Sequence, residues 1–247
     1  MTHSTVLVNG SPVHYLVAGS GEAVVLIHGL SGSTLWWRPT LPALLPGYRV
    51  FLVDLPGFGR MRRMARQFAL SNAAHWLADW MQAVGLREAN VVGHSMGGYI
   101  ALQLAAIAPH AVSRLILVTP AGMPKSRTIL GYTLPLIRAL PHMAPRFFPV
   151  LVADALRAGP LTVLRAARDL TAQDVRAAAS EVRAPTLIVC GRHDTLVPPS
   201  AGTVLRQLLP NARYLLIDGA GHVPMYERPS AFNEALLAFL GDQPVGE

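Results

Sequence analysis

A serine flanked by glycines is the residue of this chain best suited to do chemistry. Ser95 lies in the segment Gly-His-Ser-Met-Gly-Gly at 93–98, after a short apolar run at 90–92 and before helix-forming residues at 99–106. Glycines two residues to either side remove the Cβ atoms that would collide in so tight a strand-to-helix turn. Such a turn holds a serine hydroxyl in a strained, accessible position above the edge of a sheet, where it can act as a nucleophile. An ordinary glycine-rich turn has similar residues, so the interpretation depends on partners elsewhere in the chain.

An aspartate and a histidine further along the chain supply those partners. A serine hydroxyl is a weak nucleophile until a base takes its proton, and the base needs an acid that orients it. Asp194 follows an apolar run at 186–190, and His222 follows another run at 213–217. Loops after parallel strands emerge at the same carboxyl edge of a sheet, so both side chains can converge on Ser95 there. The chain order Ser, Asp, His is the one expected of such a site.

Each partner also has a plainer interpretation. Asp194 alone would suit a turn, and His222 alone would suit a solvent-facing loop. The three residues together, in this order and after these elements, favour a catalytic triad. Asp54 also follows a strand but precedes the serine, so we expect it to be a turn residue. His94 should leave the turn in a direction that differs from that of the base, and His193 should pack within its own loop.

Backbone amides near the serine are the expected donors to an oxyanion. The N–H of Met96 follows the nucleophile at a helix N-terminus, where the helix dipole favours negative charge. The second donor is expected to be the N–H of Leu30, in the glycine-rich loop after the strand at 23–27. Other residues are candidates for the wall of the substrate pocket, although core packing is an equal alternative for the tryptophans. These candidates are His28, Gly29, Trp36, Trp37 and Val223.

Apolar runs that alternate with helix-like stretches predict the fold. Runs that are apolar throughout are typical of parallel strands, and the alternation implies helices on both faces of a parallel sheet. An Asn-Gly turn at 9–10 predicts an opening hairpin. Strands are expected at 6–8, 13–17, 23–27, 49–53, 90–92, 114–118, 186–190 and 213–217. Helices are expected within 36–45, at 71–84 with Ser71 as its cap, and at 99–106, 201–209 and 230–240.

The alternation stops after Pro120 and resumes near residue 186. Between 122 and 184 the sequence has helix-like stretches and no convincing strand, and prolines interrupt its first half. We therefore predict an α/β core formed by residues 1–121 and 185–247. Residues 122–184 are predicted to form a mainly helical cap over the active edge of the sheet.

Composition argues against several function classes. Hydrophobic residues make up 51% of the 247 residues. No apolar run, however, has the length of about 18 residues that is needed to span a bilayer. Neither a recognisable nucleic-acid module nor a zinc-ligand spacing is present, so we expect no nucleic-acid partner and no metal. The single cysteine, Cys190, allows no internal disulfide and is expected to be a buried thiol. With no secretory leader evident at the start, we expect a cytoplasmic location.

The net charge of +7 is concentrated in the predicted cap. Residues 122–184 carry nine basic and four acidic side chains, so this segment holds +5 of the total. A second group, Arg60, Arg62, Arg63 and Arg66, follows Asp54. A positive rim around a pocket would attract an anionic substrate or an acidic carrier protein. The plainer alternative is a solvated, arginine-rich surface.

The blocks that carry these residues resemble those of the α/β-hydrolases. They lie, in order, at 28–29, 54–59, 93–98, 191–194 and 219–222. The resemblance spans nearly the whole chain outside 122–184 and implies an α/β-hydrolase fold, with a mostly parallel eight-stranded sheet flanked by helices and a mainly helical cap insertion. Within the family the chain is similar to small capped carboxylesterases, enol-lactonases and C–C bond hydrolases. The serine at 95 argues against dehalogenases and epoxide hydrolases, which have an aspartate there.

The resemblance implies a serine hydrolase that acts on carboxylic esters through an acyl-enzyme intermediate, as a monomer or weak homo-oligomer without a cofactor. Ser95 would attack, His222 would serve as base and then acid, and Asp194 would orient His222. Three alternatives stay open. They are cleavage of a C–C bond in a vinylogous diketo acid by the same triad, a membrane-surface lipase with an apolar lid around 129–151, and a catalytically idle ligand receptor.

Overall fold

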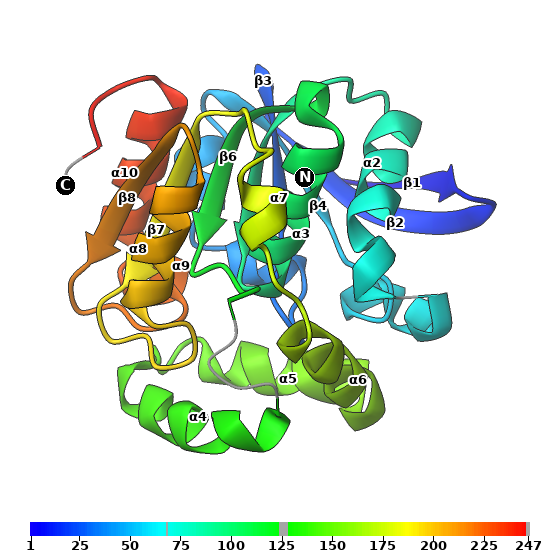
Figure 1. Ribbon diagram of the computed structural model, residues 1–247. Helices are drawn as coiled ribbons and strands as arrows, with labels where there is room; N and C mark the ends of the chain where they lie inside the picture. The colour runs from blue at the N-terminus through cyan, green and yellow to red at the C-terminus, as the bar shows by residue number, and fades with distance from the viewer. Residues whose placement is uncertain (68, 124–127, 246–247) are drawn as a thin grey trace.

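An eight-stranded sheet forms the centre of the computed structural model, which describes residues 1–67, 69–123 and 128–245 (Figure 1). The strands are β1 (Thr2–Val8), β2 (Ser11–Ala18), β3 (Glu22–Ile27), β4 (Tyr48–Val53), β5 (Ala89–His94), β6 (Val112–Val118), β7 (Thr186–Gly191) and β8 (Ala212–Ile217). Their order across the sheet is β1-β2-β4-β3-β5-β6-β7-β8. β2 pairs antiparallel with β1 and β4, whereas all other neighbours are parallel. The predicted mostly parallel sheet is therefore confirmed.

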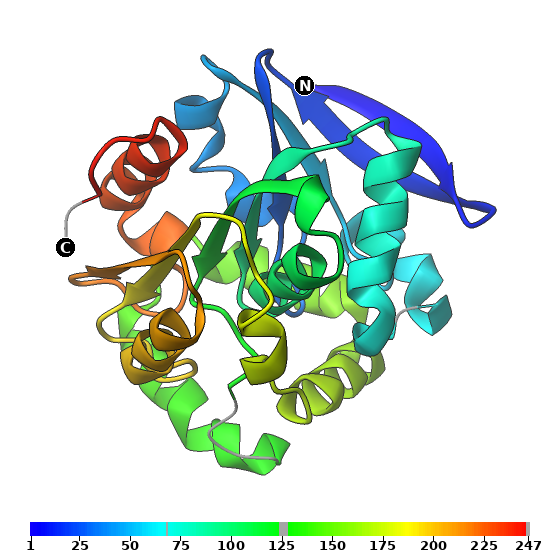
Figure 2. The same cartoon turned by 45° about the horizontal axis from the view of Figure 1, so that its top comes forward.

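Helices cover both faces of the sheet, which explains why its central strands are apolar throughout. Along β3, Val25 and Ile27 belong to one hydrophobic cluster and Val24 and Leu26 to the other, because successive side chains of a strand point to opposite faces. The first cluster includes residues of α2 (Ala73–Ala83), α3 (Met96–Ile107), α7 (Arg176–Ala179) and α8 (Pro199–Leu208). The second includes residues of α1 (Leu41–Leu44), α9 (Pro224–Glu227) and α10 (Pro229–Leu240). Figure 2 shows α10, in red, and α2, in cyan, on opposite sides of the sheet.

The helix predicted within 36–45 is shorter than expected. A 3₁₀ turn at Thr34–Trp37 is followed by only four helical residues, those of α1. Pro39 and Pro42 explain the interruption, because neither has the backbone N–H that a continuous helix needs at these positions.

The helix predicted to start at 71 begins instead at Ala73, and the prediction that Ser71 caps it is wrong. Ser71 lies in a 3₁₀ turn at Leu70–Asn72, and the carbonyl of Leu70 accepts the N–H of Ala73. The preceding turn thus satisfies an amide that a side-chain cap would otherwise bind.

Three helices of the segment 122–184 lie across the carboxyl ends of the strands. They are α4 (Thr133–Ala139), α5 (Phe148–Ala158) and α6 (Pro160–Thr171), and Figure 1 shows them together at the end towards which β6, β7 and β8 point. Within the described residues of this segment, no stretch is assigned to a strand. None of the helices in 1–67, 69–123 and 128–245 is long and apolar enough to cross a membrane.

The last part of this segment packs differently. Val175, Ala179 and Val182, in and around α7, are buried in the first hydrophobic cluster, and α7 lies against α3. The N–H of Val175 also donates to the carbonyl of Gly122 over 3.0 Å, which joins the two ends of the segment. These residues therefore belong to the packing that covers the sheet.

A buried carboxylate connects α5 to the core. Asp154 accepts hydrogen bonds from Ser33 Oγ over 2.6 Å and from Trp36 Nε1 over 3.1 Å, and it pairs with Arg157 on its own helix. A second contact joins Thr195 Oγ1 to the carbonyl of Pro135 in α4 over 2.6 Å. Because a buried charge is costly unless it is paired and hydrogen-bonded, Asp154 fixes α5 beside the loop after β3.

Removing the outer helices tests where the core ends. We expect that replacing residues 128–171 with a short glycine-serine linker leaves cooperative thermal unfolding, because all eight strands and α7 remain. Extending the deletion to 183 removes Val175, Ala179 and Val182, and we expect cooperative unfolding to be lost because α3 is then uncovered. Circular dichroism of both variants measures this. A cooperative transition in the longer deletion would instead support a core that resumes at 185.

Candidate active site

Ser95 occupies a strained turn between β5 and α3. Its φ of 51° and ψ of −112° are uncommon for a residue with a side chain, and backbone hydrogen bonds hold this conformation. The Ser95 N–H donates to the carbonyl of Val118 over 2.9 Å, and the Ser95 carbonyl accepts the N–H of Ala121 over 3.0 Å. The end of β6 and the chain that follows it therefore fix the position of the serine.

The glycines at 93 and 97 allow close backbone contacts around this turn. A Cβ at Gly93 would overlap the carbonyl oxygen of Gly97 at the start of α3. A Cβ at Gly97 would lie 2.5 Å from the carbonyl oxygen of Ile27, at the end of β3. Only glycine lets the helix approach the two strands this closely.

The structure brings together the three residues predicted to form a triad. His222 Nε2 lies 3.1 Å from Ser95 Oγ, and His222 Nδ1 lies 2.7 Å from Asp194 Oδ2. The carboxylate accepts from Nδ1–H, which leaves Nε2 free to accept the serine hydroxyl proton. The second oxygen of Asp194 accepts the N–H groups of Leu196 and Val197 over 2.8 and 2.9 Å. This arrangement can deprotonate a hydroxyl and stabilise the imidazolium that results.

The charge of Asp194 controls the protonation of His222. Burial of the imidazole disfavours its protonated form, but the charge and hydrogen bond of Asp194 outweigh burial, with a further contribution from Glu227. The pKa of His222 is therefore raised above its usual value.

Asp54 and His193, the alternatives to Asp194 and His222, have their described contacts away from Ser95. Asp54 accepts the backbone N–H groups of Thr34 and Arg60 over 2.7 and 2.8 Å, as a turn residue does. The ring of His193 is exposed and stacks on the ring of His142 in the cap segment, with ring centroids 4.5 Å apart. The order-based choice of Asp194 over Asp54 thus agrees with the geometry.

His94 supports the site in a way that its sequence position did not indicate. Its Nε2 lies 2.7 Å from the carbonyl oxygen of His222, and Thr119 Oγ1 donates to the same oxygen over 3.1 Å. Burial, aided by the charge of His222, holds the pKa of His94 well below its usual value. His94 is therefore a neutral donor to the backbone of the base.

Of the two residues whose amides are predicted to bind an oxyanion, Met96 directly follows Ser95 and Leu30 lines the same cavity as Ser95. Met96 is the first residue of α3, where helix amides have no intrahelical acceptor. Leu30 follows Gly29 in a turn closed by a 3.1 Å hydrogen bond from the Gly32 N–H to the Gly29 carbonyl, and its side chain lines the same cavity as Ser95. Within the described residues, neither the N–H of Met96 nor the N–H of Leu30 donates a hydrogen bond to a protein acceptor.

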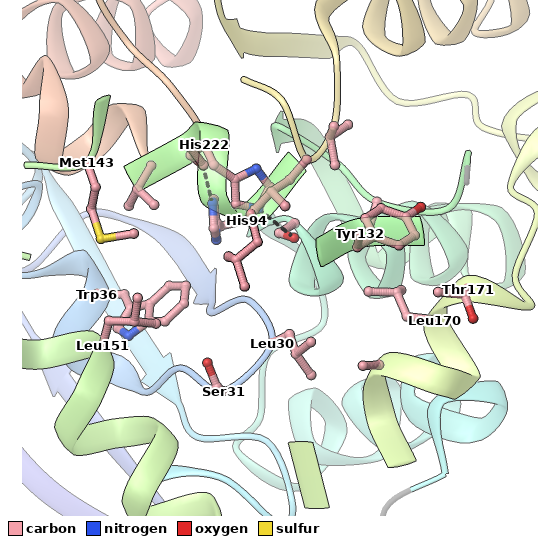
Figure 3. Close-up of a pocket in the computed structure, with 18 of the residues that line it drawn as sticks. Leu30, Ser31, Trp36, His94, Tyr132, Met143, Leu151, Leu170, Thr171 and His222 are labelled. Carbon is pink, nitrogen blue, oxygen red and sulfur yellow. Dashed lines mark hydrogen bonds between the residues drawn. The ribbon is translucent and has the colours of Figure 1, made fainter. Parts of the chain in front are cut away.

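A cavity of about 400 Å³ opens between this site and the segment 122–184 (Figure 3). His222 and His94 lie at its centre, with Trp36 and Leu151 to one side and Leu170 to the other. Most of its wall is apolar. The segment 122–184 contributes Ile129, Tyr132, Leu136, Met143, Phe147 and Leu151. No lysine or arginine of the described residues lines it, and Glu227 is its single acidic side chain there. Such a wall suits an apolar ligand.

The five residues predicted to line the pocket divide into two groups. Trp36 and Val223 line the cavity, but His28, Gly29 and Trp37 do not. His28 is fully buried, with Nε2 accepting the N–H of Leu55 over 3.0 Å and Nδ1 within 2.8 Å of the Gly29 carbonyl. Trp37 is fully buried in the second hydrophobic cluster against Phe232. Gly29 packs against the ring of His94, where a Cβ would lie 2.6 Å from Nδ1.

Two acidic residues of the site were missed in the sequence. Asp154 was counted only as part of the cap charge, although it is the one acidic residue between 122 and 168 and stands in an apolar stretch. That isolation could have indicated a buried, paired charge. Glu227 follows His222 by five residues and gave no signal, since its partners are backbone amides.

In the described residues, no three His, Cys, Asp or Glu side chains lie close enough together to bind a metal ion. Cys190 is buried beneath the site, and burial raises the pKa of its thiol to about 12. It is therefore a structural thiol, not a reactive one.

Comparison with known proteins places the chain within one family. A family model described as the α/β hydrolase fold matches residues 22–158 and 155–229. The chain is 32% identical to a 2-hydroxy-6-oxo-6-phenylhexa-2,4-dienoate hydrolase from Burkholderia cepacia, over 93% of its own length and 91% of the relative. It is 29% identical to a pimeloyl-[acyl-carrier protein] methyl ester esterase from Aeromonas hydrophila, over 90% and 97% of the two chains.

A solved structure extends the likeness to three dimensions. Est816, an N-acyl homoserine lactone degrading enzyme, superposes with a TM-score of 0.83 at 26% identity, over 96% of this chain and 100% of that protein. The likeness therefore includes the segment 122–184 as well as the sheet.

The electrostatics of the site predict how His222 titrates. We expect its imidazole to titrate above the usual histidine range in the wild-type protein, because the Asp194 charge favours protonation. In Asp194→Asn the charge is lost and burial dominates, so we expect the pKa to fall below that range. NMR titration of the imidazole C–H resonances measures both values, with His94 as an internal reference that stays neutral. An unshifted His222 in Asp194→Asn would contradict this account.

Proposed function

The chain belongs to the α/β-hydrolase fold family, and we propose that it is a serine hydrolase of carboxylic esters with an apolar acyl group. The observation that carries this proposal is the hydrogen-bonded series from Ser95 Oγ through His222 to Asp194 Oδ2. A series of this kind activates a hydroxyl for attack on a carbonyl carbon. We also propose that residues 122–184 act as the cap whose inner side binds the acyl group.

In the proposed reaction, His222 Nε2 takes the hydroxyl proton while Ser95 Oγ bonds to the ester carbonyl carbon. The N–H groups of Leu30 and Met96 stabilise the oxyanion, and His222 then gives its proton to the departing alkoxide. Water enters in the second step, loses its proton to His222 and attacks the acyl carbon. Cleavage of the acyl–serine bond releases the acid, and the proton returns to Ser95 Oγ.

The cavity favours an ester over the diketo acid substrates of a C–C bond hydrolase. A vinylogous diketo acid carries a carboxylate, and burying a charge without a partner is costly. The described wall offers no lysine or arginine, and its one carboxyl group, Glu227, would repel a second carboxylate. A relative named as a methyl ester esterase supports the same choice, while the relative named as a dienoate hydrolase keeps C–C cleavage as the alternative to be tested.

The arginines of the cap are proposed to act outside the cavity. Arg138, Arg157, Arg165 and Arg168 are exposed, and none of them lines the cavity wall. Lys125, Arg127 and the side chain of Arg66 lie outside what the structure describes. We therefore propose that the charge of an anionic substrate or of an acidic carrier protein would meet these arginines at the outer surface, while the ester group and its apolar acyl chain enter the cavity.

A substrate series tests the proposal together with Ser95→Ala. We expect turnover of p-nitrophenyl esters that improves as the acyl chain lengthens within the cavity, and little turnover of a diketo acid. Ser95→Ala should lose turnover by several orders of magnitude, because members of a triad act as a unit. Its thermal transition should match that of the wild type.

Four outcomes would overturn the proposal. Substantial esterase activity in Ser95→Ala would exclude the mechanism, and faster turnover of the diketo acid would favour C–C hydrolysis. A wild-type protein whose Ser95 is not labelled by a fluorophosphonate would favour a non-catalytic receptor. A jump in activity at a lipid–water interface would support the lipase alternative instead.

Salt dependence tests the role given to the arginines. Exposed charges are largely screened beyond about 8 Å at 0.15 M ionic strength. We expect kcat/KM for a monomethyl dicarboxylate to fall several-fold between low and physiological salt, whereas the matched neutral ester should change little. Equal salt responses for both esters would leave the arginines as a solvated surface.

A further inference from the structure

Glu227 binds the backbone on both sides of His222. Its Oε2 accepts the N–H of Gly221 over 2.6 Å and the N–H of Val223 over 3.3 Å. Glu227 is the last residue of α9, the short helix that follows the turn, and it lines the cavity. One carboxylate oxygen therefore closes the turn that carries the proposed base.

The other polar contacts of this turn come from the sheet side and from α9, where the N–H groups of Tyr226 and Glu227 donate to the Val223 carbonyl over 2.9 and 3.0 Å. The His222 carbonyl accepts from His94 Nε2 and Thr119 Oγ1, and the Ala220 carbonyl accepts the N–H of His193 over 2.8 Å. These contacts hold carbonyl groups, whereas Glu227 holds the N–H groups next to His222. Without the carboxylate, the amides of Gly221 and Val223 on either side of His222 would lose their acceptor.

The charge of Glu227 also acts on the imidazole. The titratable groups that interact with His222 are Asp194 after β7, His94 at the end of β5, and Glu227 on α9. Burial holds the pKa of Glu227 above its usual value, and the amides of Gly221 and Val223 and the charge of His222 reduce this shift without reversing it. Among the ion pairs of the described residues none involves Glu227, so no cation neutralises this carboxylate.

We propose that Glu227 is a positioning residue for His222: it fixes the turn so that the imidazole spans Ser95 and Asp194, and its charge favours the imidazolium formed during attack. The inference rests on the proposed function, because it assigns Glu227 to the activation of Ser95. A misplacement of about 1 Å in such a site can lower the rate by about 10²-fold, so loss of the acceptor for the two amides beside His222 should slow catalysis.

Two substitutions separate the acceptor from the charge. Glu227→Gln keeps the length and one oxygen that can accept both amides, but it removes the charge. Glu227→Leu keeps similar bulk and removes the acceptor as well. Glu234→Gln and Glu234→Leu are the matched controls, because Glu234 is exposed on neighbouring α10. Each variant is compared with the wild type for kcat and KM on p-nitrophenyl butyrate across pH, for the rate of fluorophosphonate labelling of Ser95, and for the thermal transition.

We expect Glu227→Leu to lower kcat and the labelling rate by about 10- to 100-fold with little change in KM, as for a misaligned base. Glu227→Gln should keep kcat within about threefold at alkaline pH, because the amides keep an acceptor. The acid limb of its kcat–pH profile should move to lower pH. The reason is that loss of the negative charge lowers the pKa of His222, so the base stays neutral in more acidic solution. Both Glu234 variants should match the wild type.

Several results would overturn the inference. One is a Glu227→Leu variant with wild-type kcat and labelling rate. Another is a Glu227→Gln variant that loses as much kcat as Glu227→Leu, or that has an unmoved acid limb. If Glu227→Leu does not fold, the rate and pH profile of Glu227→Gln decide alone. Failure of the proposed function is distinct. If the wild-type protein labels at Ser95 without turning over esters, the labelling rates still test Glu227. If Ser95 is not labelled, NMR titration of His222 decides, and a pKa of His222 that is the same in Glu227→Gln and in the wild type would overturn the inference.

Discussion

The position of Ser95 depends on a helix and three strands that meet at backbone distance. In the sheet, Gly93 of β5 pairs with Ile27 of β3, and His94 pairs with Val118 of β6. The N–H of Ser95 donates to Val118, so the register of these strands determines where the strained turn lies. A slip of one residue would turn the side chains of β5 to the opposite face and carry the serine away from the carboxyl edge. The remaining parts of the site are placed with respect to this fixed point.

The sheet and the proximity of Ser95, Asp194 and His222 could be predicted because their signals are local in the sequence. Strands buried on both faces are continuous apolar runs, such as 186–190, and the residues that follow them lie at a shared edge. Glycine at 93 and 97 marks contacts that no other residue permits. Asp194 and His222 therefore needed only their place after a strand and their order in the chain. The order and spacing of these residues in the sequence predict where they lie without any knowledge of the segment 122–184.

The cavity wall could not be predicted in the same way, because it depends on side-chain direction and tertiary contacts. Trp36 and Trp37 are neighbours in a 3₁₀ turn, where successive side chains point about 120° apart. Trp36 therefore reaches the cavity and Asp154, while Trp37 enters the core against Phe232. No pattern of residue types distinguishes the two. The same holds for Glu227, whose partners are amides that every residue but proline possesses.

Buried carboxylates explain how irregular loops hold a precise site around an apolar cavity. Asp54 binds the amides of Thr34 and Arg60, Asp154 joins the loop after β3 to α5, Asp194 binds its own loop and His222, and Glu227 binds the turn of His222. Charge-assisted hydrogen bonds are stronger and more directional than apolar contacts, so they fix loops that regular structure does not. Their donors are groups of the protein itself, and this leaves few polar groups for a ligand. For the substrate proposed above, most of the binding free energy would then come from apolar burial.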